Sequence, residues 1–377
     1  MRRGLAGALA ASAALLAVPA FAQSYHYVKI AEIYLPCPTG HGDWVAYDPS
    51  NHMVYVAMKA DGMAVIDTRT NTVAHVFKDI PQPNGMAFNA DYVYVMAAEG
   101  LPQGMNGSPA GTGFGTRNEV VTIDKHSWKI VDRLDTWPHG TTPDVAGVAN
   151  GRLYVGMDDN TVMDVWTATA HPQFVGQWPL YPQNSNHWWL NTTDYTGPDA
   201  FSFSPDGSKI YQAVDQYEEI LDAHTGAVLR HAKLDIELTG KGGTKGSAYD
   251  AKTGNVWVAT STKKPGVHVL NGQTLELIKT IPEPAGTDEL TFDPGLRLFY
   301  TFGGKGFGVY NADTMTAVTA VNTGVGTTHT GDVDTATHAV YAYEGGRAAV
   351  GVFCPVQGPG KNGAWALPGQ AVPCAAR

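Results

Sequence analysis

The sequence predicts an all-β fold: a seven-bladed β-propeller with four strands in each blade. Three observations support it. A strand–turn–strand phrase recurs seven times at a spacing of about forty residues, further strands follow most copies, and the composition favours strands and turns. The 377 residues include 43 Gly, 23 Pro and 17 Tyr, and only 16% are charged. Such a composition suits many short strands joined by tight turns.

The seven copies each open on two strands joined by a short turn. In chain order they read "GDWVAYDPSNHMVYVAM", "PNGMAFNADYVYVMA", "PDVAGVANGRLYVGM", "PDAFSFSPDGSKIYQAV", "TKGSAYDAKTGNVWVAT", "TDELTFDPGLRLFYTF" and "THTGDVDTATHAVYAY". A third strand that ends in a turn follows each opening, as in "GMAVIDTRTNTVAHVF", and then a fourth. Four strands per unit at this period are typical of a propeller blade.

The two ends of the chain predict how the ring closes. The last unit ends after "RAAVGVFCPV" without a fourth strand, whereas an unpaired strand, "YHYVKIAEIYLP", lies near the start. We expect that the N-terminal strand completes the last blade, because this arrangement leaves no open sheet edge. The predicted organisation is a signal peptide at 1–22, one propeller at 23–356 and a C-terminal tail at 357–377.

The strand–turn phrases also indicate a family. "FSFSPDGSKIYQA", "VVTIDKHSWKIVDRL" and "VAYDPSNHMVYVAM" resemble the YVTN or YncE-like propellers of exported bacterial proteins. The resemblance covers nearly the whole chain after the first 22 residues, and it implies the propeller architecture. It implies little about activity, because propellers serve as binding proteins, enzymes and structural modules.

The first residues predict export. Arg2 and Arg3 precede an apolar run of about 14 residues, and small residues at Ala20 and Ala22 indicate cleavage after Ala22. This run is too short to span a bilayer and no other segment is long enough, so we expect a periplasmic or secreted protein without membrane insertion. Cleavage changes the formal charge from −10 to −12, because two arginines leave. An acidic chain without a basic cluster disfavours nucleic acid as a partner.

Three cysteines, Cys37, Cys354 and Cys374, would enter an oxidising compartment. Two of them are expected to pair there, leaving one free. We favour Cys354 with Cys374, because this bridge closes a short loop and fixes a Pro/Gly-rich tail that has little else to hold it. Pairing of Cys37 with Cys374 is the alternative.

A column of polar residues appears when the seven openings are aligned on the strand residue before the turn. Four positions earlier, each blade contributes one residue to the column: Asp43, Asn84, Asp144, Asp199, Lys245, Asp288 and His329. The first strand of each propeller blade lines the central channel. We therefore expect these seven side chains to form a ring at one mouth of the channel, where they would bind a ligand.

Two interpretations of the column remain open. Asp or Asn at the start of an inner strand can accept backbone N–H bonds and cap the turn, which requires no ligand. Four carboxylates on one ring, however, repel one another unless a cation or protons intervene. Lys245 could neutralise two of them without a metal, or present its charge to an anionic ligand.

A divalent metal ion is the other candidate cation. The predicted ligand set is His41, Asp199, Asp288, Glu289 and His329, in which carboxylates favour Ca²⁺ or Mg²⁺ and histidines favour Zn²⁺ or Cu²⁺. Other cofactors are not expected. There is no C-x-x-C-H for haem c, and "KGGTKGS" lacks the spacing and the following helix of a nucleotide-binding loop.

An aromatic insertion, residues 179–197, runs directly into Asp199. Its His187, Trp188 and Trp189 could cover the axial pocket and stack on a flat or sugar-like ligand. The alternative is that the tryptophans pack against a neighbouring blade.

These features favour a periplasmic module that binds a small molecule, a metal ion or both at the axial ring. The alternative is a metal-dependent lyase or lactone hydrolase, with His329, His139 or Lys245 as catalytic candidates. "PNGMAFN" is similar to the metal-binding Asn phrase of gluconolactonase-type propellers. A copper redox enzyme ranks lower, because only His329 of the histidines lies in the column. A protein-binding scaffold leaves no distinct mark in the sequence.

Overall fold

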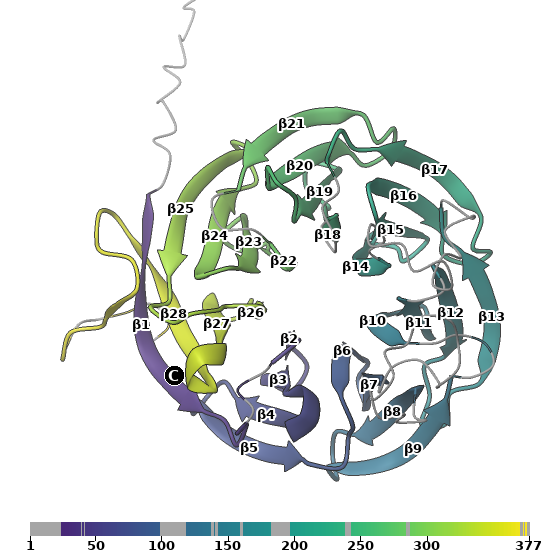
Figure 1. Cartoon of the computed structure of the whole chain (residues 1–377), viewed down its shortest axis with the longest axis horizontal. Helices are drawn as coiled ribbons and strands as arrows, with labels where there is room; N and C mark the ends of the chain where they lie inside the picture. Colours follow the sequence, from purple (N-terminus) through teal and green to yellow (C-terminus); the bar gives the residue numbers. More distant parts are fainter. Residues whose placement is uncertain are drawn as a thin grey trace, which may run out of the picture.

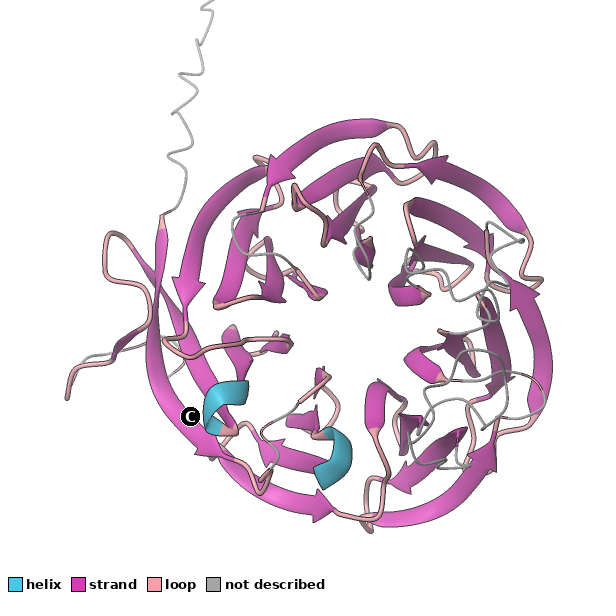
Figure 2. Cartoon of the chain, in the orientation of Figure 1, coloured by secondary structure: helices cyan, strands magenta, loops and turns pink. Residues whose placement is uncertain are grey.

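The structure is a computed structural model, and it describes residues 24–38, 40, 42–98, 118–136, 139, 142–158, 161–181, 197–237, 243–283, 287–369, 372 and 374. The described residues form seven sheets that follow one another around a central axis in chain order (Figure 1). Apart from two short 3₁₀ helices, η1 (Lys59–Asp61) and η3 (Gly345–Arg347), this part of the chain consists of strands, turns and loops (Figure 2). The predicted seven-bladed propeller is confirmed.

Each of the first six blades is a four-stranded antiparallel sheet whose strands run outward from the axis in chain order. The strands of blades one to three are β2 (Val45–Asp48), β3 (Met53–Ala57), β4 (Met63–Asp67), β5 (Thr72–Phe77); β6 (Pro83–Phe88), β7 (Tyr92–Ala98), β8 (Asn118–Asp124), β9 (Lys129–Asp135); β10 (Pro143–Ala149), β11 (Arg152–Met157), β12 (Val162–Thr167), β13 (Phe174–Pro179). Those of blades four to six are β14 (Pro198–Phe203), β15 (Lys209–Val214), β16 (Tyr217–Asp222), β17 (Val228–Lys233); β18 (Thr244–Asp250), β19 (Asn255–Thr260), β20 (Gly266–Asn271), β21 (Leu277–Pro282); β22 (Glu289–Asp293), β23 (Leu298–Gly303), β24 (Gly306–Asn311), β25 (Thr316–Asn322).

Blade seven joins the two ends of the chain, as predicted. It contains β26 (Gly331–Asp334), β27 (Ala339–Glu344) and β28 (Ala349–Gln357), followed outward by β1 (Tyr25–Tyr34), which pairs antiparallel with β28. Tyr27 fixes this junction, because it is fully buried and its hydroxyl donates to the Tyr300 hydroxyl at 3.1 Å. The N-terminal strand thus completes the ring and covers the edge of β28.

The hydrophobic core lies between the blades. The middle strands of each blade are almost wholly buried, and in the described residues their side chains form seven clusters, each shared by two neighbouring blades. Tyr55 of blade one and Met86 of blade two belong to one such cluster. Burial of each large apolar side chain contributes about 1.5–3 kcal/mol, so the interfaces between blades hold the ring together.

The C-terminal tail is held by more than the predicted disulfide. Cys354 and Cys374 are bonded, which confirms the favoured pairing, and Cys37 is a buried thiol whose Sγ lies 3.7 Å from the Tyr343 hydroxyl. In addition, β29 (Ala364–Trp365) pairs parallel with β1 as a fifth strand, and the side-chain oxygen of Asn362 accepts from the Tyr27 amide at 2.9 Å. The expectation that little else holds the tail is therefore wrong.

No helix in the described part of the chain has the length and apolar character that crossing a membrane requires.

The first strand of each blade is the one nearest the axis (Figure 1). In β14, every residue after Pro198 is only half-buried. Asp199, at the beginning of this strand, is therefore not enclosed in a core.

Candidate functional site

The candidate site is a set of charged side chains at the beginnings of the inner strands. The structure links six of the seven column residues through contacts between neighbouring blades. A lysine that sequence alignment missed joins them. We call this set the axial ring; it comprises Asp43, Lys59, Asn84, Asp144, Asp199, Lys245, Asp288 and His329.

His329 lies between two carboxylates from the blades on either side. Its Nδ1 is 2.5 Å from Oδ2 of Asp288 in blade six, and its Nε2 is 3.6 Å from Oδ1 of Asp43 in blade one. Against the effect of burial, these two carboxylates raise the pKa of His329 to about 10. The imidazole is therefore a cation at neutral pH, and both of its ring nitrogens carry protons.

Lys245 links the next two blades in the same way. Its Nζ lies 3.0 Å from Oδ1 of Asp288 and 3.4 Å from Oδ2 of Asp199. Against burial, His329 and Lys245 together lower the pKa of Asp288 to about 2. The sequence left two roles open for Lys245: neutralisation of two aspartates, or contact with an anionic ligand. The structure shows the first.

Lys59 is the member that the column did not contain. It stands at the start of η1, between the second and third strands of blade one, and its Nζ lies 2.7 Å from Oδ2 of Asp43. It also donates to Oδ1 of Asn84 in blade two. Gly62 ends η1 with φ of 85°, and a Cβ there would lie 2.0 Å from the Phe77 carbonyl oxygen. Alignment of the inner strands could not identify Lys59, because the turn that carries this lysine lies outside those strands.

Asp144 lies on the remaining side of the ring, and no ion pair to it is found in the described part of the chain. Burial raises its pKa well above the usual range, the charges of Asp158, Asp43 and Asp199 act in the same direction, and the charge of Lys59 acts against them. Next to it, Asn84 donates from Nδ2 to the Pro143 carbonyl at 3.2 Å. The pKa of Asp199 is also raised, because burial outweighs the effect of Lys245. The side-chain cations therefore act against the predicted repulsion, and the raised pKa values of Asp144 and Asp199 favour the uptake of protons, which acts in the same sense.

The predicted metal ligands are only partly brought together. Asp288 and His329 meet, and both ring nitrogens of His329 face carboxylates, those of Asp288 and Asp43. The Glu289 carboxylate accepts from the Thr330 hydroxyl and, at 3.2 Å, from the Gly331 amide, and burial raises its pKa well above the usual range. Within the described ranges, no three His, Cys, Asp or Glu side chains form a group that could hold a metal ion.

The remaining candidates lie away from the ring or outside the described residues. His139 stacks on Phe174 with ring centroids 3.7 Å apart, and its carbonyl oxygen accepts from Gln177. Because Phe174 and Gln177 belong to the outermost strand of blade three, His139 contacts the outer strand rather than the ring. His41, His187, Trp188 and Trp189 fall outside the residues that the structure describes.

Comparisons with known proteins support the fold. Neither a protein-family model nor a curated protein sequence matches the chain. A chain in the crystal structure of the Mitotic Checkpoint Complex aligns with a TM-score of 0.66 and 11% identity, covering 93% of this chain and 98% of the other. The β-propeller domain of Cps50 (Swd1) from Myceliophteria thermophila aligns with a TM-score of 0.65 and 10% identity, covering 87% and 99%. At these identities the likeness defines the class of protein, a β-propeller, and nothing finer.

Proposed function

We propose that this chain is an exported propeller of the YVTN or YncE-like kind that binds a small polar molecule at the axial ring. The observation that carries the proposal is the alternation of charge around the ring, in the order Lys59, Asp43, His329, Asp288, Lys245 and Asp199. Partly buried ion pairs are weak evidence for stability, because desolvation offsets their attraction. A ring that retains several of them at a channel mouth is a candidate binding site.

The charges of the ring favour a neutral ligand. Two lysines and the His329 cation oppose Asp43, Asp199 and Asp288, while the raised pKa of Asp144 favours its neutral form. Such a site offers fixed donors and acceptors around the axis without a strong net charge. A polyhydroxylated molecule such as a sugar matches this pattern, because each hydroxyl both donates and accepts.

The export part of the proposal rests on the sequence of residues 1–22, and the disulfide between Cys354 and Cys374 agrees with an oxidising compartment. Detection of the mature chain in a periplasmic or culture fraction tests it. Retention of the uncleaved chain in the cytoplasm would contradict it.

Binding is tested by calorimetric titration with D-glucose, D-galactose and D-mannose. We expect at least one sugar to bind, and Lys245→Met to weaken its binding about tenfold or more through loss of a charged hydrogen-bond donor. The control is Lys263→Met, which removes an exposed lysine that pairs with Glu237. If no sugar binds, or if both variants behave alike, the proposed ligand class is wrong.

Metal analysis of the same purified protein tests the alternative of a metal-dependent enzyme. Stoichiometric calcium or magnesium that is lost in both Asp199→Ala and His329→Ala would support the lyase or hydrolase, and stoichiometric copper would support the redox enzyme. We expect neither, because no three His, Cys, Asp or Glu side chains in the described residues form a group that could hold a metal ion.

A further inference from the structure

A buried glutamine, Gln212, contacts the backbone of Asp199 from outside the axial ring. It lies in β15, the second strand of blade four, and it is fully buried. The register of the ladders defines the equivalent residue in each blade, because that residue pairs with the one two positions after the column residue. The equivalent residue is a fully buried valine in blades one, two, three and five: Val56, Val95, Val155 and Val258.

The exchange of valine for glutamine in blade four needs a physical reason. Burial of an amide costs free energy unless its hydrogen bonds are satisfied, whereas burial of a valine side chain is favourable. Departures of this kind from a local pattern are expected at functional or strained sites. The contacts of Gln212 therefore indicate what the amide does.

Gln212 borders a β-bulge that contains Asp199. The ladder between β14 and β15 shifts its register between Pro198 and Phe201, so Asp199 and Ala200 lie opposite a single residue of β15. A bulge takes backbone groups out of the ladder and changes the direction of the side chain that it carries. Backbone groups that leave the ladder need other partners.

The Gln212 amide bridges the two strands at this bulge. Its Nε2 donates to the carbonyl oxygen of Asp199 at 2.7 Å and to the carbonyl oxygen of Ala213 at 2.7 Å. An amide nitrogen carries two N–H groups, so one serves each strand. A valine at this position has no donor for either carbonyl.

The bond to the Asp199 carbonyl also bears on the Asp199 carboxylate. This carbonyl and the Ala200 N–H belong to one planar peptide group, so fixing the oxygen fixes the direction of the N–H. The Ala200 N–H donates to Oδ1 of Asp199 at 2.9 Å, and Oδ2 of the same carboxylate lies 3.4 Å from Nζ of Lys245. The orientation of the carboxylate thus depends on the peptide group that Gln212 holds.

We propose that Gln212 is a positioning residue of the axial ring. By fixing the peptide group between Asp199 and Ala200, it directs the Asp199 carboxylate toward Lys245 and toward a bound sugar. The part that concerns the sugar rests on the proposed function, whereas the contact with Lys245 does not.

Crystal structures of two variants test the contact without a ligand. Gln212→Val introduces the residue of four other blades, and we expect a rotated peptide group and more than about 4 Å between Oδ2 of Asp199 and Nζ of Lys245, beyond the range of an ion pair. The control is Thr301→Val at the equivalent position of blade six, where the hydroxyl donates to Glu283. It should leave Asp199 as in the wild type. An unchanged Asp199 side chain in Gln212→Val would show that the proposal is wrong.

Sugar affinity and melting temperature separate positioning from a role in stability alone. We expect Gln212→Val to weaken binding of the sugar that the wild type binds by about fivefold or more, while its melting temperature falls no more than that of Thr301→Val. A variant that melts lower but binds the sugar as the wild type does would show that Gln212 only stabilises blade four. If the wild type binds no sugar, the proposed function is wrong, and the crystal structures alone decide whether Gln212 positions Asp199.

Discussion

The Nζ atom of Lys245 lies 3.0 Å from Oδ1 of Asp288, and this contact joins the inner strands of blades five and six at the channel mouth. Lys245 is the second residue of β18 and Asp288 immediately precedes β22, so the contact depends on the register of two adjacent blades. On the other side Lys245 reaches Asp199 of blade four. One lysine therefore neutralises carboxylates of both neighbouring blades, and its own pKa is raised by them against the effect of burial.

Lys245→Met is expected to destabilise the protein by about 2 kcal/mol at pH 7, because two partly buried carboxylates lose their common cation. The penalty should shrink towards pH 4, because Asp199, whose pKa is already raised by burial, takes up a proton more readily once Lys245 is absent. Chemical denaturation at both pH values measures the change. Lys263→Met is the control, since its exposed pair with Glu237 contributes about 0–1 kcal/mol. Equal penalties at pH 7 and pH 4 would contradict the electrostatic explanation.

His329→Gln should reduce stability at pH 6 and have little effect at pH 10. A histidine pKa raised from 6.5 to about 10 contributes stability that is complete below pH 6.5 and is lost as the pH rises through about 10. The group is 41% exposed, so solvent screening limits the expected loss at pH 6 to about 1–2 kcal/mol.

Denaturation curves for the wild type and for His329→Gln between pH 5 and pH 10 test this dependence. His126→Gln is the control, because His126 is largely exposed and lies 3.5 Å from Asp91. A stability difference that does not change with pH would mean that His329 acts through packing rather than charge.

The sequence was sufficient to predict the blades and the closure of the ring. Strand periodicity and turn residues are local, and the ring requires only that similar units pack side by side. The sequence also predicted the column of polar residues, because equivalent positions in the seven blades lie at the same level along the channel axis. Asp199, which interrupts an apolar strand in the sequence, occupies such a position.

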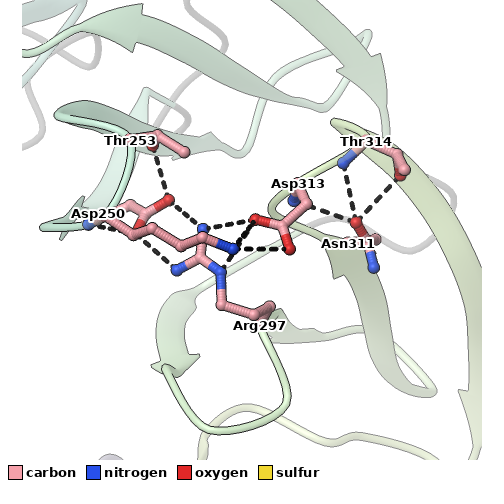
Figure 3. A network of polar contacts seen from close by, with 7 residues as sticks. Asp250, Thr253, Arg297, Asn311, Asp313 and Thr314 are labelled. Atoms are coloured by element: carbon pink, nitrogen blue, oxygen red, sulfur yellow. Dashed lines mark hydrogen bonds and ion pairs between the residues drawn. The ribbon is translucent and has the colours of Figure 1, made fainter. Parts of the chain in front are cut away.

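The contacts within the ring could not be predicted in the same way. Lys59 reaches Asp43 from a turn outside the inner strand, so no alignment of inner strands includes it. Asp250 and Asp293, at the ends of two inner strands, each contact a residue of the next blade. The partner is Arg297 for Asp250 (Figure 3) but His338 for Asp293. Side-chain contacts across blades depend on packing, which the repeat pattern does not encode.

Asp144→Asn should not reduce stability at pH 6 and should increase it at pH 9. A carboxyl group with a raised pKa favours the folded state while it is protonated, and it costs stability progressively as the pH rises above about 3.8. Asparagine has nearly the same shape and removes this cost. The melting temperatures of the two proteins across this pH range measure the effect.

Asp206→Asn is the control, because the change expected in its stability has the opposite sign. Hydrogen bonds from Ser204 and Ser208 lower the pKa of Asp206 to about 2, so its ionised form favours the folded state above pH 3.8. Its replacement should therefore lower stability at pH 6 and pH 9 alike. A loss of stability in Asp144→Asn at both pH values would show that Asp144 is ionised and paired in the folded protein.

Replacement of Cys354 and Cys374 by serine should destabilise the protein by about 3 kcal/mol or less, because the bridge spans a sequence separation of 20 residues. The loss is expected to be smaller than the loop-closure estimate, since β29 and Asn362 also hold the tail. The rate of trypsin cleavage after the exposed Lys361 measures release of the tail. The wild-type protein with its disulfide intact is the reference. Asn362→Ala in the oxidised protein measures the second anchor separately. Cleavage should accelerate modestly in either variant and strongly in the combination, because each anchor limits the effect of losing the other. If loss of the disulfide alone releases the tail completely, the strand and the asparagine are not independent anchors.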